Sequence, residues 1–175
     1  MMKKIVSIEK RLSKLKLWAN LIPKNSFFDN LRHIFTNEEW DIIRKFVYKR
    51  DDYKCNICKQ EEIKLEAHEE WVYNYKEETQ KLNNIISLCS LCHFNKHLGF
   101  AEIVIKEKKL TKKSLIKHWG WINQEKEENF DSYRDRVFEL WNLKNVIKWK
   151  ITSFDGNLIS NKIDLFNLLK FLATR

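Results

Sequence analysis

Hydrophobic residues recur every three or four positions over much of the chain, a spacing that places them on one face of an α-helix. Thr36 followed by Glu39 forms a capping box, which marks the start of one such segment. The pattern predicts helices over residues 4–18, 37–50, 112–128, 131–144 and 160–173. Both ends of the chain are therefore expected to be mainly helical.

The middle of the chain has short apolar runs in place of helical periodicity. IKLEAH (63–68) and NIISLC (84–89) each favour a short strand, and a loop is expected at 70–84 between them. SLCHFNKHLGFAEI then predicts a helix with Gly99 near its C-terminal end. A third strand is expected within 145–152, where apolar and polar residues alternate. Strands between helical flanks indicate the α+β class.

The composition supports a folded core. Of the 175 residues, 43% are hydrophobic and 13% aromatic, with only 3 Gly and 1 Pro, which excludes disordered and low-complexity classes. No stretch approaches the roughly 18 apolar residues that a membrane span requires, and the charged N-terminus does not resemble a secretory signal. We therefore expect no membrane partner and a cytoplasmic location, where cysteines stay reduced.

The charge balance suggests a polyanionic partner. The chain carries 33 Lys and Arg against 24 Asp and Glu, a formal net charge of +9. The basic residues concentrate in 3–16 and 106–117, and such clusters are either backbone contacts to a nucleic acid or solvated helix faces. Lysine neutralises phosphates without reading sequence. The candidate nucleic-acid contacts are Lys108, Lys109, Lys112 and Lys113.

All four cysteines lie in two matched pairs, Cys55-x-x-Cys58 and Cys89-x-x-Cys92. Two intervening residues let both thiolates of a pair reach one ion, and two such turns give the tetrahedral sulfur shell that Zn²⁺ favours. Buried hydrophobic cysteines and a redox Cys-x-x-Cys are the alternatives, but neither explains two matched pairs. We expect a structural zinc site, because four protein ligands leave no open position for a substrate.

A second group of chemistry-bearing residues surrounds the cysteines. His93 and His97 are four residues apart on an expected helix, so both imidazoles can approach one cation. His68 ends the strand after the first cysteine pair, and His93 directly follows the second pair, so zinc binding would bring the two together. The alternative for each histidine is an ordinary core or surface role, which is the role we expect for His118, outside the cluster.

CNIC, LEAHEEW and LNNIISLCSLCHFNKH together resemble the HNH endonuclease motif in its four-cysteine form, as found in small bacterial and phage proteins. His68, Asn84 and His93 match the three motif positions. The resemblance implies a ββα-metal fold at 51–105 that contains the zinc site. It would lie between a basic helical region at 1–50 and a helical region with a short strand at 106–175.

The resemblance also implies an activity, the metal-dependent hydrolysis of phosphodiester bonds in double-stranded DNA. In this reading His68 is the general base that activates water. His93 and His97 hold one catalytic divalent cation (Mg²⁺, Mn²⁺, Ni²⁺ or Zn²⁺), which neutralises charge at the phosphate. Asn84 has an architectural role through side-chain hydrogen bonds.

One position departs from the family pattern. The residue before the base is usually an Asp or His that ligates the cation, and here it is Ala67. Strand alternation places Glu69 on the same side as residue 67, so Glu69 is the expected substitute, with Glu66 second. The departure keeps two alternatives open: a catalytically impaired zinc-knuckle protein that binds nucleic acid or acts as an adaptor, and a purely structural zinc protein.

Overall fold

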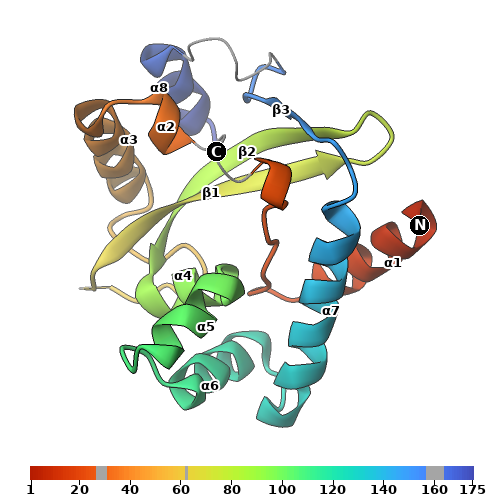
Figure 1. Ribbon diagram of the computed structural model, residues 1–175. Helices are drawn as coiled ribbons and strands as arrows, with labels where there is room; N and C mark the ends of the chain where they lie inside the picture. The colour runs from red at the N-terminus through yellow and green to blue at the C-terminus, as the bar shows by residue number, and fades with distance from the viewer. Residues whose placement is uncertain (27–30, 62, 157–163) are drawn as a thin grey trace.

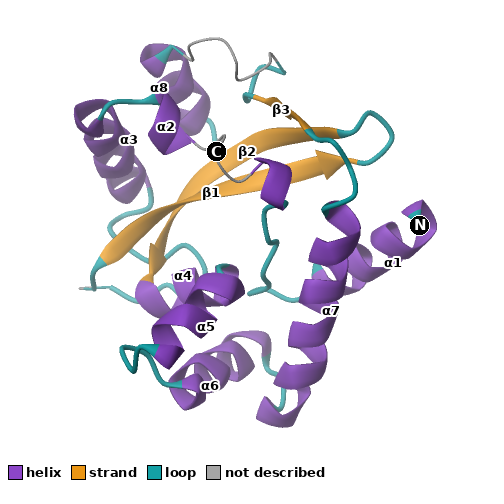
Figure 2. Ribbon diagram, viewed as in Figure 1, coloured by secondary structure: helices purple, strands orange, loops and turns teal. Residues whose placement is uncertain are grey.

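The computed structural model describes residues 1–26, 31–61, 63–156 and 164–175, and the fold is of the α+β class (Figure 2). A three-stranded sheet has helices on both faces. The strands are β1 (Leu65–Asn74), β2 (Thr79–Cys89) and β3 (Lys150–Thr152). The helices are α1 (Met2–Leu12), α2 (Leu31–Ile34), α3 (Asn37–Arg50), α4 (Ser90–Lys96), α5 (Leu98–Lys106), α6 (Lys112–Asn123), α7 (Phe130–Lys144) and α8 (Leu165–Ala173), with 3-10 turns at Lys24–Ser26 and Glu127–Asn129.

The helix expected at 37–50 is confirmed as α3. The Thr36 hydroxyl accepts a hydrogen bond from the Glu39 backbone N–H (3.2 Å), and the Glu39 carboxylate accepts one from the Thr36 N–H (2.9 Å), so the capping box is complete. Ile43 and Val47 on the apolar face are fully buried. The sequence therefore determines both the start and the buried face of this helix.

Helix α1 ends at Leu12, earlier than the expected 18. After it, distant side chains take the backbone hydrogen bonds that a longer helix would use. Asn123 accepts from the Leu17 N–H (2.8 Å) and donates to the Leu17 carbonyl (2.9 Å), while the Tyr133 hydroxyl accepts from Ala19 N–H (2.8 Å). These bonds tie the N-terminal segment to α6 and α7, and local periodicity does not reveal them.

The loop expected at 70–84 is wrong, because β1 and β2 form one long antiparallel hairpin. β1 continues to Asn74 and β2 begins at Thr79, with Glu78 at a positive φ of 54° in the connection. Asn84 therefore lies within β2, opposite Glu70, and does not open the strand. Buried or half-buried residues alternate with exposed ones from Trp71 to Tyr75, as in a strand with one packed face, and the expectation of a loop overlooked this alternation.

The sheet has an irregularity at its centre. Glu70 pairs with Asn84 and Trp71 pairs with Leu82, so Asn83 is an extra residue in β2 and forms a bulge. At the far end of the hairpin, β3 pairs in parallel with residues 79–81 of β2. β3 is shorter than the strand expected at 145–152.

The helix expected from Ser90 onward is interrupted. His97 has φ −112° and ψ 57°, which ends α4 at Lys96 and starts α5 at Leu98. The prediction that Gly99 lies near a helix C-terminus is therefore wrong, because Gly99 lies in the first turn of α5. His97 sits at the corner between the two helices.

The C-terminal helices agree with the periodicity apart from their ends. α7 matches the helix expected at 131–144. α6 ends at Asn123, before the expected 128, because Gln124 adopts a left-handed conformation (φ 55°). A Cβ at Gly120 would lie 2.9 Å from the Glu125 carbonyl oxygen, so glycine allows this close turn. For the helix expected at 160–173, the described part is α8, and residues 157–163 lie outside the described residues.

The two faces of the hairpin have different partners (Figure 1). On one face Ala67, Trp71, Leu82 and Ile85 pack with residues of α3 and α8 in one hydrophobic cluster. The opposite face carries His68 and meets α4. Among the described helices, none has the length and apolar character needed to cross a membrane.

Candidate metal centres

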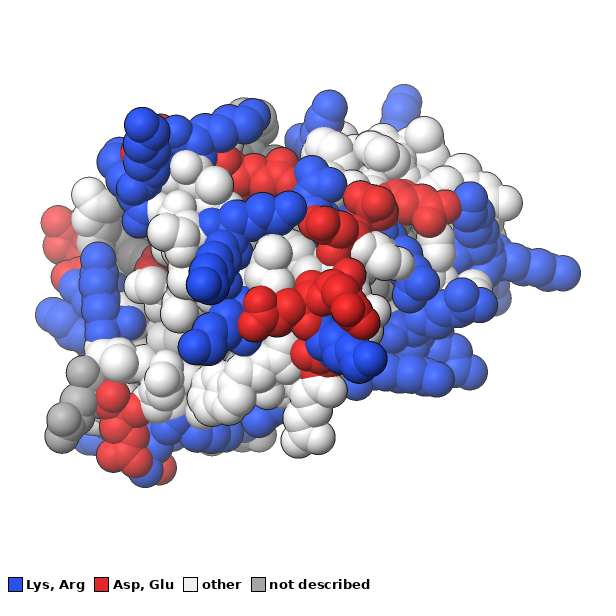
Figure 3. Space-filling view, turned by 90° about the horizontal axis from the view of Figure 1, so that it is seen from below, with Lys and Arg blue, Asp and Glu red and all other residues white. Residues whose placement is uncertain are grey.

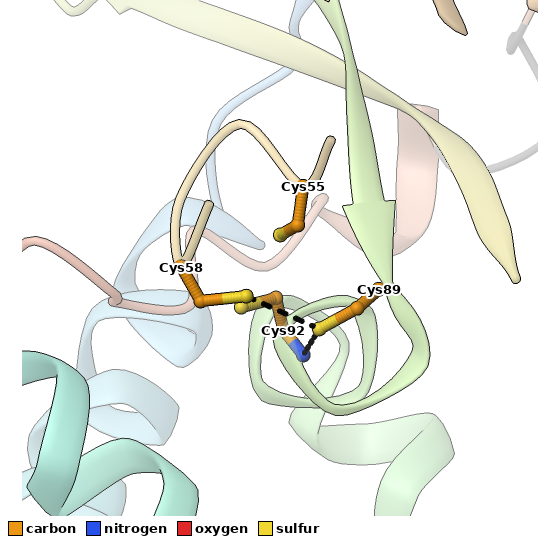
Figure 4. A group of neighbouring side chains, drawn as sticks. All are labelled: Cys55, Cys58, Cys89 and Cys92. Atoms are coloured by element: carbon orange, nitrogen blue, oxygen red, sulfur yellow. Dashed lines mark hydrogen bonds between the residues drawn. The ribbon is translucent and has the colours of Figure 1, made fainter. Parts of the chain in front are cut away.

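The four cysteines converge at the junction of the hairpin with α4 (Figure 4). Their sulfur atoms all lie within 4.8 Å of one another, and the Cys58 and Cys89 sulfurs are 3.7 Å apart. Ligands 2.3 Å from a tetrahedral zinc ion have about this sulfur–sulfur spacing. All four are free thiols, and three are buried. The four cysteines could therefore bind a zinc ion.

The electrostatics of this group favour a bound cation. The hydrogen bond with Cys55 raises the pKa of Cys89 to about 12, and it also raises the pKa of Cys92. Hydrogen bonds from Cys89 and Cys92 lower the pKa of Cys55. Without a metal, the Cys55 thiolate would therefore accept hydrogen bonds from the protonated thiols of Cys89 and Cys92. A divalent cation would instead compensate the charge of several thiolates.

Local backbone geometry shapes the first cysteine turn. Lys59 has a positive φ of 64°, and its N–H donates to the Cys55 carbonyl (2.8 Å), which folds the chain between Cys55 and Cys58 back on itself. Asn56 N–H donates to the Ser87 carbonyl (2.8 Å) and so joins the turn to β2. The turn is therefore held beside the second pair by hydrogen bonds as well as by the sulfur group.

The second group consists of His68, His93 and His97, whose ring nitrogens also lie within 4.8 Å of one another. Nδ1 of His68 is 3.0 Å from Nε2 of His97. The expected proximity of His68 and His93 is confirmed, since their ring centroids are 5.6 Å apart. Strand β1 supplies one imidazole, and α4 with the corner after it supplies two. Three convergent imidazoles are a donor set that suits Zn²⁺ or Ni²⁺ better than Mg²⁺.

Glu66 lies behind this imidazole group. Its carboxylate is 3.0 Å from Nδ1 of His93 and accepts a hydrogen bond from the Ser90 hydroxyl (3.1 Å). The hydrogen bond with His93 lowers the pKa of Glu66, which keeps the carboxylate ionised. A carboxylate on one ring nitrogen fixes the tautomer and turns the other nitrogen toward a metal. Glu66 is therefore placed to orient His93.

Glu69 lies on the other face of β1, which it shares with Ala67 as alternation predicts. Its carboxylate accepts hydrogen bonds from the backbone N–H of Leu31 (3.1 Å) and the indole N–H of Trp71 (3.1 Å). Among the described residues, the imidazole group includes no carboxylate. The structure thus places Glu69 next to α2. It lines the same cleft as His68 and His97 but is not a member of the imidazole group.

Asn84 connects β2 to α3. Its side-chain oxygen accepts from the Arg50 guanidinium (3.1 Å), and Arg50 also donates to the Ile85 carbonyl (2.7 Å) and forms an ion pair with Asp51 (2.8 Å). The Asp51 carboxylate in turn accepts from the backbone N–H of Ser87 (2.9 Å). Asn84 therefore belongs to a network that fixes the end of α3 against β2.

A cleft of about 580 Å³ opens beside the imidazole group. It is bounded by α1, the segment that follows α1, strand β1 and the end of α4. His68 and His97 line it, and so does Asn83 at the bulge. Its wall carries both signs of charge, from Lys10 and Lys96 and from Glu9, Glu69 and Glu70, with the Lys96 ammonium 3.5 Å from Glu70. His68 and His97 of the imidazole group are thus accessible from an open cleft.

His68 is electrically neutral under ordinary conditions. Burial, together with the nearby charges of His97, Lys96 and His93, lowers its pKa well below the usual 6.5. A neutral imidazole has a free lone pair at neutral pH, so it can accept a proton or bind a cation. The protein environment therefore keeps this ring in the form that either role requires.

The four lysines expected to contact nucleic acid lie away from the cleft. Lys108 and Lys109 are in the connection between α5 and α6, and Lys112 and Lys113 open α6. Lys109 pairs with Glu107 (2.8 Å) and Lys112 with Asp131 (3.1 Å). Figure 3 shows Lys and Arg side chains on both sides of a band of Asp and Glu side chains. Basic charge on this face is interspersed with acidic charge.

Sequence reasoning missed three residues beside these centres. Lys96 and Asn83 line the cleft, and Nε2 of His118 is 3.1 Å from the Cys92 sulfur. The bulge that places Asn83 in the cleft and the contact of His118 with Cys92 both depend on distant parts of the chain, so the local sequence pattern does not indicate them. The contact between α4 and α6 that places His118 there became visible only in the folded chain.

The residues that make up both centres come from separate segments, and the cysteine group and the imidazole group meet on α4.

A scan against protein-family models, a search of curated proteins and a search of solved structures each found no match for this chain.

Proposed function

We propose that this chain is a metal-dependent endonuclease that hydrolyses phosphodiester bonds in DNA, with β1, β2 and α4 as a ββα-metal core of the HNH type. The observation that carries the proposal is the convergence of His68, His93 and His97 beside a cleft, supported by a cysteine group on the same helix. This arrangement agrees with the HNH resemblance of the sequence around these residues.

Each imidazole has a role in the proposed reaction. His93, oriented by Glu66, and His97 would hold the catalytic cation, which would supply stabilisation of negative charge on the phosphate and the leaving oxygen. His68 lines the cleft and accepts the proton of the attacking water. Nδ1 of His68 is 3.0 Å from Nε2 of His97, so His68 is also placed to be a third metal ligand. Measuring metal affinity distinguishes this ligand role from the role of general base.

A polyanionic substrate is supported by the net charge of +9 of the whole chain. The lining of the cleft itself carries both signs of charge, Lys10 and Lys96 together with Glu9, Glu69 and Glu70. Helix α1 carries further exposed basic side chains, Lys3, Lys4 and Arg11, of which Lys4 pairs with Glu139 of α7 (2.6 Å). Because lysine and arginine neutralise phosphates without base recognition, the proposed binding is mainly electrostatic and weakens with salt.

The test is plasmid cleavage by zinc-loaded protein with added Mg²⁺, Mn²⁺, Ni²⁺ or Zn²⁺. We expect nicking that falls about 100-fold or more in His68→Ala, because a general base contributes roughly 10²–10⁴ in rate. Glu77→Ala, an exposed change at the tip of the same hairpin, is the control and should cleave normally. Circular dichroism and zinc content confirm that both variants fold.

Metal affinity then assigns the role of His68. If His68 is the base, the Ala variant binds the second cation as the wild type does, whereas loss of that affinity identifies His68 as a ligand. Undiminished cleavage by the variant would refute the catalytic assignment altogether.

The second candidate is a zinc-containing module that binds nucleic acid, or acts as an adaptor, without cleaving. It is favoured by Ala67, which occupies the usual ligand position but packs in the core on the face opposite His68. This candidate predicts salt-sensitive DNA binding and intact plasmid with all four metal ions. Binding without cleavage would therefore select it over the nuclease.

A further inference from the structure

We propose that His118 is a fifth member of the cysteine centre, a positioning residue whose N–H donates a hydrogen bond to the zinc-bound thiolate of Cys92. Nε2 of His118 lies 3.1 Å from the Cys92 sulfur. The side chain comes from α6, a helix that contributes no cysteine, and it reaches the centre from a segment 26 residues away in sequence. This inference concerns the structural metal and does not depend on the proposed nuclease activity.

His118 is buried, so the hydrogen-bond partner of its ring nitrogen matters for stability. Only 7% of the residue is exposed, and the exposed Trp121 ring lies against it, with centroids 5.6 Å apart. A buried ring nitrogen needs a hydrogen-bond partner, because leaving it unpaired destabilises the fold. The sulfur of Cys92 is the partner that the geometry provides for Nε2.

The chemistry of a loaded centre fixes the direction of the bond. A cysteine that binds zinc is deprotonated, so its sulfur can only accept. The Nε2 of His118 must therefore carry the hydrogen when zinc is bound. Four thiolates around one Zn²⁺ leave a net charge of about −2, and a donor on one sulfur stabilises that excess negative charge.

The bond also joins two helices. Asn95 of α4 donates from its amide to the Leu115 carbonyl of α6 (3.3 Å), which is a second polar link between the same elements. Asn95 is fully buried. Cys92 precedes His93 directly, so α6 supports the stretch of α4 that carries both a zinc ligand and a candidate cation ligand.

Two substitutions separate hydrogen bonding from packing. His118→Gln keeps an N–H near the position of Nε2, whereas His118→Phe keeps the ring volume and removes the donor. We expect zinc release to a chromophoric chelator to be about tenfold faster in the Phe variant, since outer-shell changes typically alter metal affinity 10–100-fold. The Gln variant should release zinc close to the wild-type rate. A purely packing role predicts the reverse order, and that order would overturn the proposal.

Cobalt substitution supplies a readout that packing does not move. With Co²⁺ in the cysteine centre, the sulfur-to-cobalt charge-transfer band should shift to lower energy in the Phe variant and stay in place in the Gln variant, because the hydrogen bond lowers the energy of the sulfur electrons. An identical band in all three proteins contradicts the assignment.

The wild-type protein gives a test that needs no variant. In the zinc-loaded chain, long-range ¹H–¹⁵N correlation spectra should show the His118 tautomer with hydrogen on Nε2. A bare Nε2, or one bonded to the metal, would overturn the proposal even if the substituted proteins fail to fold.

Discussion

Glu66 is placed to affect the imidazole group through its contact with His93. Its carboxylate holds Nδ1 of His93, and it lies on the face of β1 that also carries His68. Strand alternation correctly grouped Glu69 with Ala67, but that face packs against α3 and α8. The family pattern does not say which face of the strand meets the histidines, so it gave no sign of the contact between Glu66 and His93.

We predict that Glu66→Ala lowers the affinity of the imidazole group for Ni²⁺ or Zn²⁺ by about 10–100-fold, because His93 loses its orienting partner. Isothermal titration calorimetry, with zinc already bound to the four cysteines, measures the affinity of the imidazole group for the added cation. The matched control is Glu69→Gln, which should keep the affinity although it weakens the bonds to Leu31 and Trp71. If Glu69→Gln loses the cation and Glu66→Ala keeps it, Glu69 is the ligand that the sequence pattern indicated.

Among the elements, the helices were more predictable than the hairpin. α3 follows from its capping box, and both α3 and α7 follow from 3.6-residue periodicity, because each buries one continuous stripe. The hairpin was predicted as two short strands with a long loop, because charged and polar residues separate its two apolar runs. The corner at His97 was also missed, because apolar residues continue through it and only the backbone angles change.

Helix α4 depends on the cysteine centre for its start. Cys89 is its N-cap, with the sulfur accepting from the Cys92 N–H (3.4 Å), and a seven-residue helix is marginal by itself. We predict that removing zinc with a chelator accelerates amide hydrogen exchange in α4 about tenfold or more, while α7, which packs on α1, keeps its protection. Equal protection of α4 with and without zinc would contradict this dependence.

For the whole molecule, Lys144 links stability to pH. It is fully buried, donates to Asn20 (2.6 Å) and lies 3.5 Å from the Tyr73 ring centre, yet burial lowers its pKa to about 7 from 10.5. Below pH 7 the ammonium is charged in both states, so its burial destabilises the fold fully. Between pH 7 and 10.5 the unfolded chain binds more protons than the folded one, so stability rises with pH.

We predict that Lys144→Met removes this rise, whose steepest slope is about 1.4 kcal/mol per pH unit. Urea unfolding of zinc-saturated protein at several pH values between 7 and 10 measures the slope in both proteins. Lys148→Met, at an exposed position on the same segment, is the control and should follow the wild type. Parallel curves for wild type and Lys144→Met would show that Lys144 does not carry the effect.

The shared helix has a consequence for the order in which metals enter. Because Cys92 and His93 are consecutive, an ion in the sulfur centre immobilises the backbone from which the imidazole centre is built. Under the proposed function, the first ion would therefore reduce the conformational entropy that the catalytic cation must remove, and occupancy of the two sites would be coupled in both directions. A fall in free zinc would then weaken binding of the second ion as well, so the supply of one nutrient metal would govern the proposed activity.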